Sequence, residues 1–245
     1  MNIKIINIFI YFFLIAEVFA GIGNNNEAAT RDTAMYLKNP LYQRRIEMFK
    51  ISKLKSAKIV MLGNSLTEGG NWSDLLGRRS VANRGITGDI LEGYLHRMEY
   101  VTKLKPKVCF IEGGINDIYN WVPVKKIYQN YKKVIEILRK NKIKPVIQST
   151  LYTARHWGKE WLESHNPGTK PEEVNRERNR EVDKLNALLR EYARKNKIIF
   201  IDLNSKMSSR GFLKNSYTWD GAHLNAKGYR IWAQEVIKVL NKLGL

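Results

Sequence analysis

Four short stretches of the chain carry the residue types that ester-cleaving chemistry requires. They are, in chain order, Gly63-Asn64-Ser65-Leu66, Asn83-Arg84-Gly85, Gly113-Gly114-Ile115-Asn116-Asp117 and Asp220-Gly221-Ala222-His223. A serine hydroxyl attacks a carbonyl well only when a neighbouring base takes its proton, and the oxyanion that forms needs fixed hydrogen-bond donors. The four stretches supply a serine, candidate donors and an Asp/His pair, and together they predict nucleophilic acyl transfer.

The serine and the histidine stand where such chemistry would place them. Ser65 follows an apolar, strand-like run, so we expect it just past the carboxyl end of a strand, where open parallel sheets form their ligand crevices. His223 alone among the four histidines has a carboxylate partner, Asp220, beside a glycine turn. We therefore expect His223 to deprotonate Ser65 and Asp220 to hold the imidazole. The alternative for Ser65 is a helix cap.

Two further residues are candidate oxyanion donors. Gly85 follows the second apolar run, and a glycine lets a backbone N–H approach a ligand closely. Asn116 offers a side-chain NH₂ that donates without titrating. Both stretches also fit ordinary turn chemistry, with Gly85 as a turn residue and Asp89 as the N-cap of a following helix.

The combination resembles the SGNH hydrolases, or GDSL-type esterases, whose four sequence blocks carry Ser, Gly, Asn and His in this order. The resemblance spans nearly all of the chain after residue 20, within the branch of platelet-activating-factor acetylhydrolase-like and carbohydrate acetylesterase-like enzymes. It implies Ser65 as nucleophile, an oxyanion hole from the N–H groups of Ser65 and Gly85 with the Asn116 side chain, and Asp220 and His223 completing the triad. It also implies a flavodoxin-like three-layer α/β/α sandwich. Asn64 stands where the name motif has Asp, which leaves the hydrogen bonding around the nucleophile open.

The apolar pattern independently predicts a parallel sheet between helices, because strand-like runs alternate with helical periodicity. We expect five strands, at 59–62, 81–83, 108–112, 146–149 and 198–202, and helices near 44–53, 124–139, 182–192 and 231–243. The segment 152–175, rich in Trp, His, Pro and Gly, interrupts the alternation. It is expected either to wall the substrate site or to be an ordered surface excursion.

The first twenty residues have the pattern of a secretory signal, with Lys4 before an apolar run that ends in Val18-Phe19-Ala20. We expect a signal peptide at 1–20, a single domain at 21–245 and export to the periplasm or beyond. No stable membrane span is expected after cleavage; a retained anchor is the alternative. Cys109, the single cysteine, is expected to be a small buried hydrophobe in a strand.

The formal net charge of +19 is the same after removal of residues 1–20, which contain one Lys and one Glu. It favours anionic partners such as acidic sugars, although the charges are scattered enough to be a solvated surface. Export argues against nucleic acid as a partner.

These observations predict a serine esterase for short acyl groups, chiefly acetyl groups on carbohydrates such as sialic acid. No metal or organic cofactor is expected, because the acyl-enzyme mechanism needs none. A zinc hydrolase is unlikely, because the chain has neither His-Glu-x-x-His nor paired-cysteine spacing. A lipid acylhydrolase or thioesterase, and a noncatalytic glycan-binding module, remain alternatives. Five aromatic residues could stack on sugars or simply pack: Trp121, Trp157, Trp161, Tyr217 and Trp219.

Overall fold

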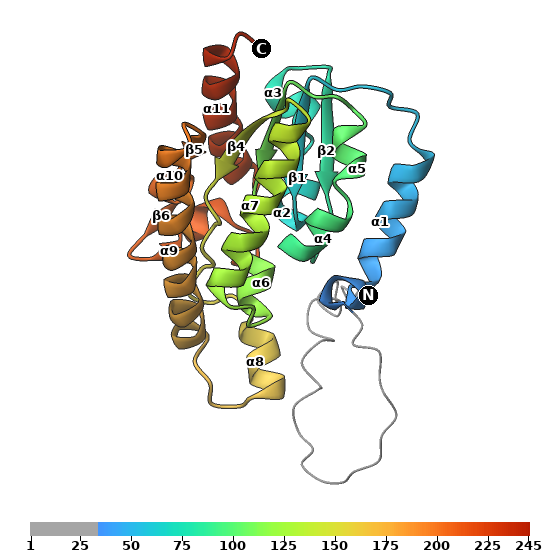
Figure 1. Ribbon diagram of the computed structural model, residues 1–245. Helices are drawn as coiled ribbons and strands as arrows, with labels where there is room; N and C mark the ends of the chain where they lie inside the picture. Colours follow the sequence, from blue (N-terminus) through green and yellow to red (C-terminus); the bar gives the residue numbers. More distant parts are fainter. Residues whose placement is uncertain (1–33) are drawn as a thin grey trace, which may run out of the picture.

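A five-stranded parallel sheet forms the centre of the molecule, as predicted (Figure 1). The computed structural model describes residues 34–245; the predicted signal peptide and the start of the predicted domain lie outside them. The strand order β2-β1-β3-β4-β5 is that of flavodoxin-like doubly wound sheets. The strands are β1 (Ile59–Gly63), β2 (Val81–Gly85), β3 (Val108–Ile111), β4 (Lys144–Gln148) and β5 (Ile199–Ile201).

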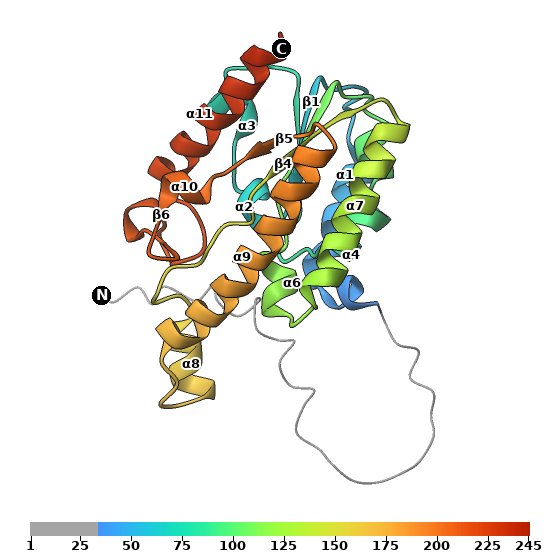
Figure 2. The same ribbon diagram turned by 60° about the vertical axis from the view of Figure 1, so that its left-hand side comes forward.

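Helices cover both faces of this sheet, which completes the predicted three-layer sandwich (Figures 1 and 2). Alternate strand residues point into two cores: Val60 and Leu62 into one, Met61 and Phe110 into the other. Burial on both faces explains why the strands read as continuous apolar runs. One face carries α4 (Leu91–His96), α5 (Glu99–Thr102), α7 (Val124–Lys140) and α9 (Pro171–Lys195); the other carries α2 (Ser65–Glu68), α3 (Trp72–Leu76), α10 (Asn204–Met207) and α11 (Ala226–Lys242).

The helix α1 (Pro40–Ile51) begins four residues earlier than predicted. The side chain of Asn39 accepts a hydrogen bond from the Leu41 N–H, and Pro40 occupies the first helical position, where its missing N–H costs nothing. The helix packs through Tyr42 and Phe49 beside Ile86, so it covers the chain that leaves β2. The short 3-10 helix η2 (Met35–Lys38) precedes it.

The segment 152–175 is more regular than predicted, because it contains α8 (Lys159–His165) and the start of α9. Pro171 opens α9, and Glu172 and Glu173 in its first turn complement the helix dipole. Neighbouring pieces that the sequence pattern did not predict are α6 (Ile115–Tyr119), η3 (Asn215–Tyr217) and the hairpin of β6 (Ser208–Ser209) and β7 (Phe212–Leu213).

Because all five strands are parallel, the chain leaves β1, β2 and β3 at one edge of the sheet, where α2, α4 and α6 begin. The three predicted site stretches that follow strands therefore meet at this edge. No helix within residues 34–245 is long and apolar enough to cross a membrane.

Candidate active site

Ser65, His223 and Asp220 form a continuous hydrogen-bonded relay. The Ser65 Oγ lies 3.1 Å from Nε2 of His223, and Nδ1 of the same ring lies 2.6 Å from Oδ2 of Asp220. Residues 158 positions apart in the sequence are thus brought into contact at the edge of the sheet. The arrangement lets the ring accept a proton on one nitrogen while the carboxylate fixes the other, as a nucleophile with its base requires.

The loop that carries Asp220 and His223 is built to keep the carboxylate ionised. The Oδ1 atom of Asp220 accepts hydrogen bonds from the backbone N–H groups of Ala222 (2.8 Å) and His223 (2.7 Å). Burial raises the pKa of Asp220, but the hydrogen bonds from the His223 ring and these amides outweigh burial and lower the pKa overall. Asp220 is therefore charged and acts only as an acceptor.

The segment 152–175 contacts this loop through a backbone hydrogen bond and a packing contact. The Ala154 N–H donates to the Gly221 carbonyl at 2.7 Å, and Gly221 lies against Trp157 with φ +103°. A Cβ at Gly221 would approach the Trp157 Cβ to 2.9 Å, so only glycine fits both the backbone angle and the contact. The side chain of Asn175 in turn donates to the carbonyls of Ala154 and Trp157. This segment therefore positions the histidine loop.

Ser65 is the first residue of α2, and Asn64 caps that helix. The Asn64 Oδ1 accepts the Leu66 N–H at 2.9 Å, so the amide fills the capping role that a carboxylate would have here. The alternative interpretation of Ser65 as a cap is therefore wrong. Within the described residues the Ser65 N–H has no hydrogen-bond partner, and it is free for a ligand.

Asn116 lies in α6 at the same edge, 7% exposed, and its Nδ2 donates to the Asp89 carbonyl at 2.8 Å. One Nδ2 hydrogen is thus used to orient the amide, and the second is available.

The structure contradicts the predicted role of Gly85 as an oxyanion donor. Its N–H donates to Oδ1 of Asn83 at 2.8 Å, and that side chain also donates to the carbonyls at the end of α2. A Cβ at Gly85 would lie 2.2 Å from the Glu68 backbone nitrogen. Glycine is therefore required here for close packing of β2 against the serine helix.

Gly88 is a candidate donor that the sequence reasoning missed. It lies in a turn closed by the Asp89 N–H to the Ile86 carbonyl, has φ +73°, and directly precedes the residue to which Asn116 is bonded. No hydrogen bond within residues 34–245 engages its N–H. The signal in the sequence was the second glycine after the strand, where a turn with positive φ favours glycine.

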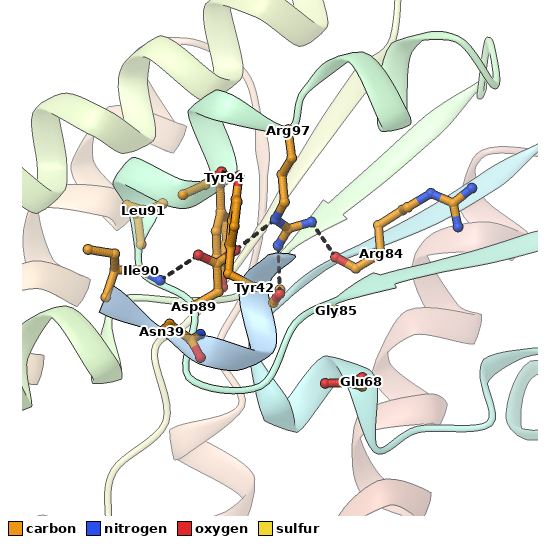
Figure 3. A network of polar contacts seen from close by, with 12 residues as sticks. Asn39, Tyr42, Glu68, Arg84, Gly85, Asp89, Ile90, Leu91, Tyr94 and Arg97 are labelled. Atoms are coloured by element: carbon orange, nitrogen blue, oxygen red, sulfur yellow. Dashed lines mark hydrogen bonds and ion pairs between the residues drawn. The ribbon is translucent and has the colours of Figure 1, made fainter. Parts of the chain in front are cut away.

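Near the strand ends that carry the site, the Arg97 side chain hydrogen-bonds two backbone carbonyls and one carboxylate (Figure 3). Its fully buried guanidinium donates to Oδ2 of Asp89 (2.7 Å), to the Arg84 carbonyl (2.7 Å) and to the Gly63 carbonyl (2.9 Å). Gly63 ends β1 just before the nucleophile, and Arg84 lies near the end of β2. Burial raises the pKa of Asp89 to about 6, while the Arg97 charge opposes that rise.

Asp89 is consequently not the N-cap of α4 that the sequence allowed. Its Oδ1 accepts only the N–H of Ile90, and the first helical N–H, that of Leu91, donates to the Asp117 carboxylate.

A third carboxyl group, that of Glu112 directly after β3, is buried without a hydrogen-bond partner for either oxygen among the described residues. Burial raises the pKa of Glu112 from 4.5 to about 8. Cys109, within β3, is buried as predicted, and burial raises the pKa of its thiol.

The model of the GDSL-like lipase/acylhydrolase family matches residues 61–231, which contain every residue of this site. The chain belongs to this family. It is a carboxylic ester hydrolase, in accord with the relay described above.

Solved structures are similar to this acylhydrolase over most of its length. A GDSL-like lipase from Bacteroides thetaiotaomicron is 26% identical with a TM-score of 0.68, covering 82% of this chain and 98% of its own. Axe2, an acetylxylan esterase from Geobacillus stearothermophilus, is 17% identical with a TM-score of 0.57, covering 79% and 97%; it shares the fold.

Among curated proteins, an N-acylneuraminate cytidylyltransferase from Streptococcus agalactiae is 27% identical over 135 residues, 52% of this chain. The aligned region is 28% of that relative's length, so the acylhydrolase spans only about a quarter of it.

Removing the buried cation should destabilise the acylhydrolase strongly. Arg97→Met leaves the Asp89 carboxylate buried and unpaired, and we expect a loss of about 3–5 kcal/mol in the free energy of unfolding. The matched variant Arg84→Met removes another buried guanidinium that hydrogen-bonds only backbone carbonyls, so it should cost clearly less. Urea denaturation of the three proteins measures both losses. Equal losses would show that the Asp89 ion pair is not what matters.

Glu112→Gln should stabilise the fold increasingly as pH rises. A carboxyl whose folded pKa is above its unfolded value binds more protons when folded, so wild-type stability falls between about pH 4.5 and about pH 8. The variant has no carboxyl group at this position to titrate. Its free energy of unfolding should therefore exceed that of the wild type by an amount that grows through this pH range, to the order of a few kcal/mol, and then stays constant. Denaturation at several pH values, with the exposed Glu136→Gln as control, measures the difference. An advantage that does not change with pH would contradict the expectation.

Proposed function

We propose that this acylhydrolase removes short acyl groups, chiefly acetyl groups, from carbohydrates such as sialic acid, through an acyl-enzyme intermediate. The observation that carries the proposal is the relay from Ser65 through His223 to Asp220, with 3.1 and 2.6 Å between successive polar atoms. A noncatalytic glycan-binding role would not require this alignment.

In the proposed reaction the Ser65 Oγ forms a bond to the ester carbonyl carbon while its proton passes to Nε2 of His223. The tetrahedral intermediate then breaks the bond to the alcohol oxygen, and the alcohol leaves with the proton from His223. Water next adds to the acyl-enzyme, again giving a proton to His223. Breakage of the Ser65 ester bond releases the carboxylic acid and returns the proton to the serine.

Three donors are proposed for the oxyanion: the N–H groups of Ser65 and Gly88 and the Nδ2 of Asn116. Gly88 replaces Gly85, whose N–H is already bonded to Asn83. The two backbone N–H groups have no hydrogen-bond partner within residues 34–245, and the Asn116 amide is fixed by its bond to Asp89. Fixed donors of this kind stabilise developing charge without reorganisation.

Several observations support a short acyl group on a sugar. The fold is shared with an acetylxylan esterase, and the curated relative is named for an acylneuraminate. A net charge of +19 favours acidic sugars over neutral ones.

Ser65→Ala should lower ester hydrolysis by several orders of magnitude and leave the fold intact, because the nucleophile is lost but the core is untouched. Initial rates on p-nitrophenyl esters and on O-acetylated sialic acid measure the loss, with Ser73→Ala on α3 as the matched control. In the wild type, acetyl esters should be cleaved much faster than octanoyl esters. Full activity of folded Ser65→Ala would refute the assignment, and a preference for octanoyl would favour a lipid acylhydrolase or thioesterase.

Export is part of the proposal. We expect cleavage of the predicted signal peptide at residues 1–20, so that the secreted protein begins near Gly21. Amino-terminal sequencing of the mature protein from the cell exterior or periplasm tests this. An unprocessed chain in the membrane fraction would instead support a retained anchor.

A further inference from the structure

The structure separates the five candidate sugar-stacking aromatics into two groups. Trp157 is buried and packs edge-on against Tyr119, Trp161 stacks on His165 within α8, and Tyr217 is only partly exposed against a core. Trp121 and Trp219 are the exposed aromatic side chains among the described residues, at 71% and 63%. Both belong to segments that also carry a residue of the active site.

Trp219 directly precedes Asp220, and its ring stacks on the imidazole of His223. The ring centroids are 5.7 Å apart and the planes differ by 20°. The backbone N–H of Trp219 also donates to the His223 carbonyl at 3.2 Å, which holds the two residues together. Since nearly two thirds of Trp219 remains accessible, its indole offers a flat apolar surface beside the catalytic base.

Trp121 lies two residues beyond the end of α6, the helix that carries Asn116. It has φ +59°, the left-handed conformation of a helix C-cap, in which the N–H groups of Trp121 and Val122 donate to the carbonyls of Ile118 and Asp117. The buried Arg178 guanidinium lies over the ring, its Cζ 3.4 Å from the ring centroid, and donates to the Ile118 carbonyl. An exposed indole is thus held in place by a buried cation.

The chemistry of the reaction determines how an ester must lie relative to these two rings. The carbonyl oxygen must face the donors at Ser65 and Asn116, and the alcohol oxygen must lie near Nε2 of His223, from which it takes its proton. The alcohol portion is therefore beside Trp219. A neighbouring unit of a longer substrate can extend past Asn116 toward Trp121.

We propose that Trp219 and Trp121 are two ring-binding subsites for a glycan: Trp219 for the sugar that carries the ester, and Trp121 for an adjacent sugar. The inference rests on the proposed function. A pyranose ring presents a face of C–H groups and a rim of hydroxyl groups, so it stacks on an exposed indole without burying an unpaired polar group. A linear acyl chain gains no comparable contact from two separate flat surfaces.

The test compares three acetyl esters: ethyl acetate, O-acetylated sialic acid, and the same sugar at the end of a trisaccharide. Trp219→Ala should raise KM about threefold to tenfold for both sugar esters relative to the KM for ethyl acetate, which has no ring to stack, whatever its common effect on kcat. Trp121→Ala should raise KM for the trisaccharide alone. Trp219→Phe and Trp121→Phe keep a ring and should recover much of the lost affinity. Leu188→Ala, which truncates an exposed apolar residue on α9, is the control and should change nothing.

Two results would overturn the subsites. If Trp219→Ala lowered kcat for all three esters and left the ratios of their KM values unchanged, the indole would serve only to hold His223. If Trp121→Ala left the trisaccharide kinetics unchanged, the second subsite would not exist. Failure of the proposed function is distinguishable from both, because a wild-type enzyme that cleaves ethyl acetate but neither sugar ester would lack the proposed substrate class itself.

Discussion

The site depends on one buried cation. The Arg97 guanidinium bonds the Gly63 carbonyl before the nucleophile, the Arg84 carbonyl near the end of β2, and the carboxylate of Asp89. Each contact alone is an ordinary hydrogen bond, but together they fix the ends of two strands relative to the loop that follows the second. Because the pair is fully buried, neither charge can be solvated if the other moves, and the geometry has a single satisfied arrangement.

Further polar contacts extend this frame to the serine helix. Asn83 donates to the carbonyls at the end of α2, and Oε2 of Glu68 accepts the N–H and hydroxyl of Thr87 on the β2–α4 turn. On the opposite side the histidine loop is held by Ala154 and Trp157. The Ser65 hydroxyl, the turn at Gly88 and the His223 ring are therefore positioned by contacts that converge on the carboxyl edge of the sheet, as preorganised catalysis requires.

Three buried carboxyl groups lie near these contacts, and burial makes their ionised form less stable. Asp89 and Asp117 both have raised pKa values, to about 6 and about 7, chiefly because of burial, and both accept hydrogen bonds at the edge of the sheet. Glu112 has no such partner among the described residues. Asp89 and Asp117 lie in the segments that follow β2 and β3, and Glu112 directly follows β3, so all three buried carboxyl groups lie at the carboxyl edge of the sheet.

The sequence determined the sheet, its flanking helices and the identity of Ser65, Asn116, Asp220 and His223, because apolar periodicity and short motifs are local properties of the chain. It did not determine which glycine has a backbone N–H that is free to bind a ligand. Gly85 and Gly88 are only three residues apart, and their N–H groups are distinguished by the Asn83 side chain and the turn at Asp89. Nor did it reveal the hold of Arg97 on Gly63, 34 residues away, or which tryptophans stay exposed. Those properties arise only when distant segments pack, since burial and hydrogen-bond partners are defined by the folded chain.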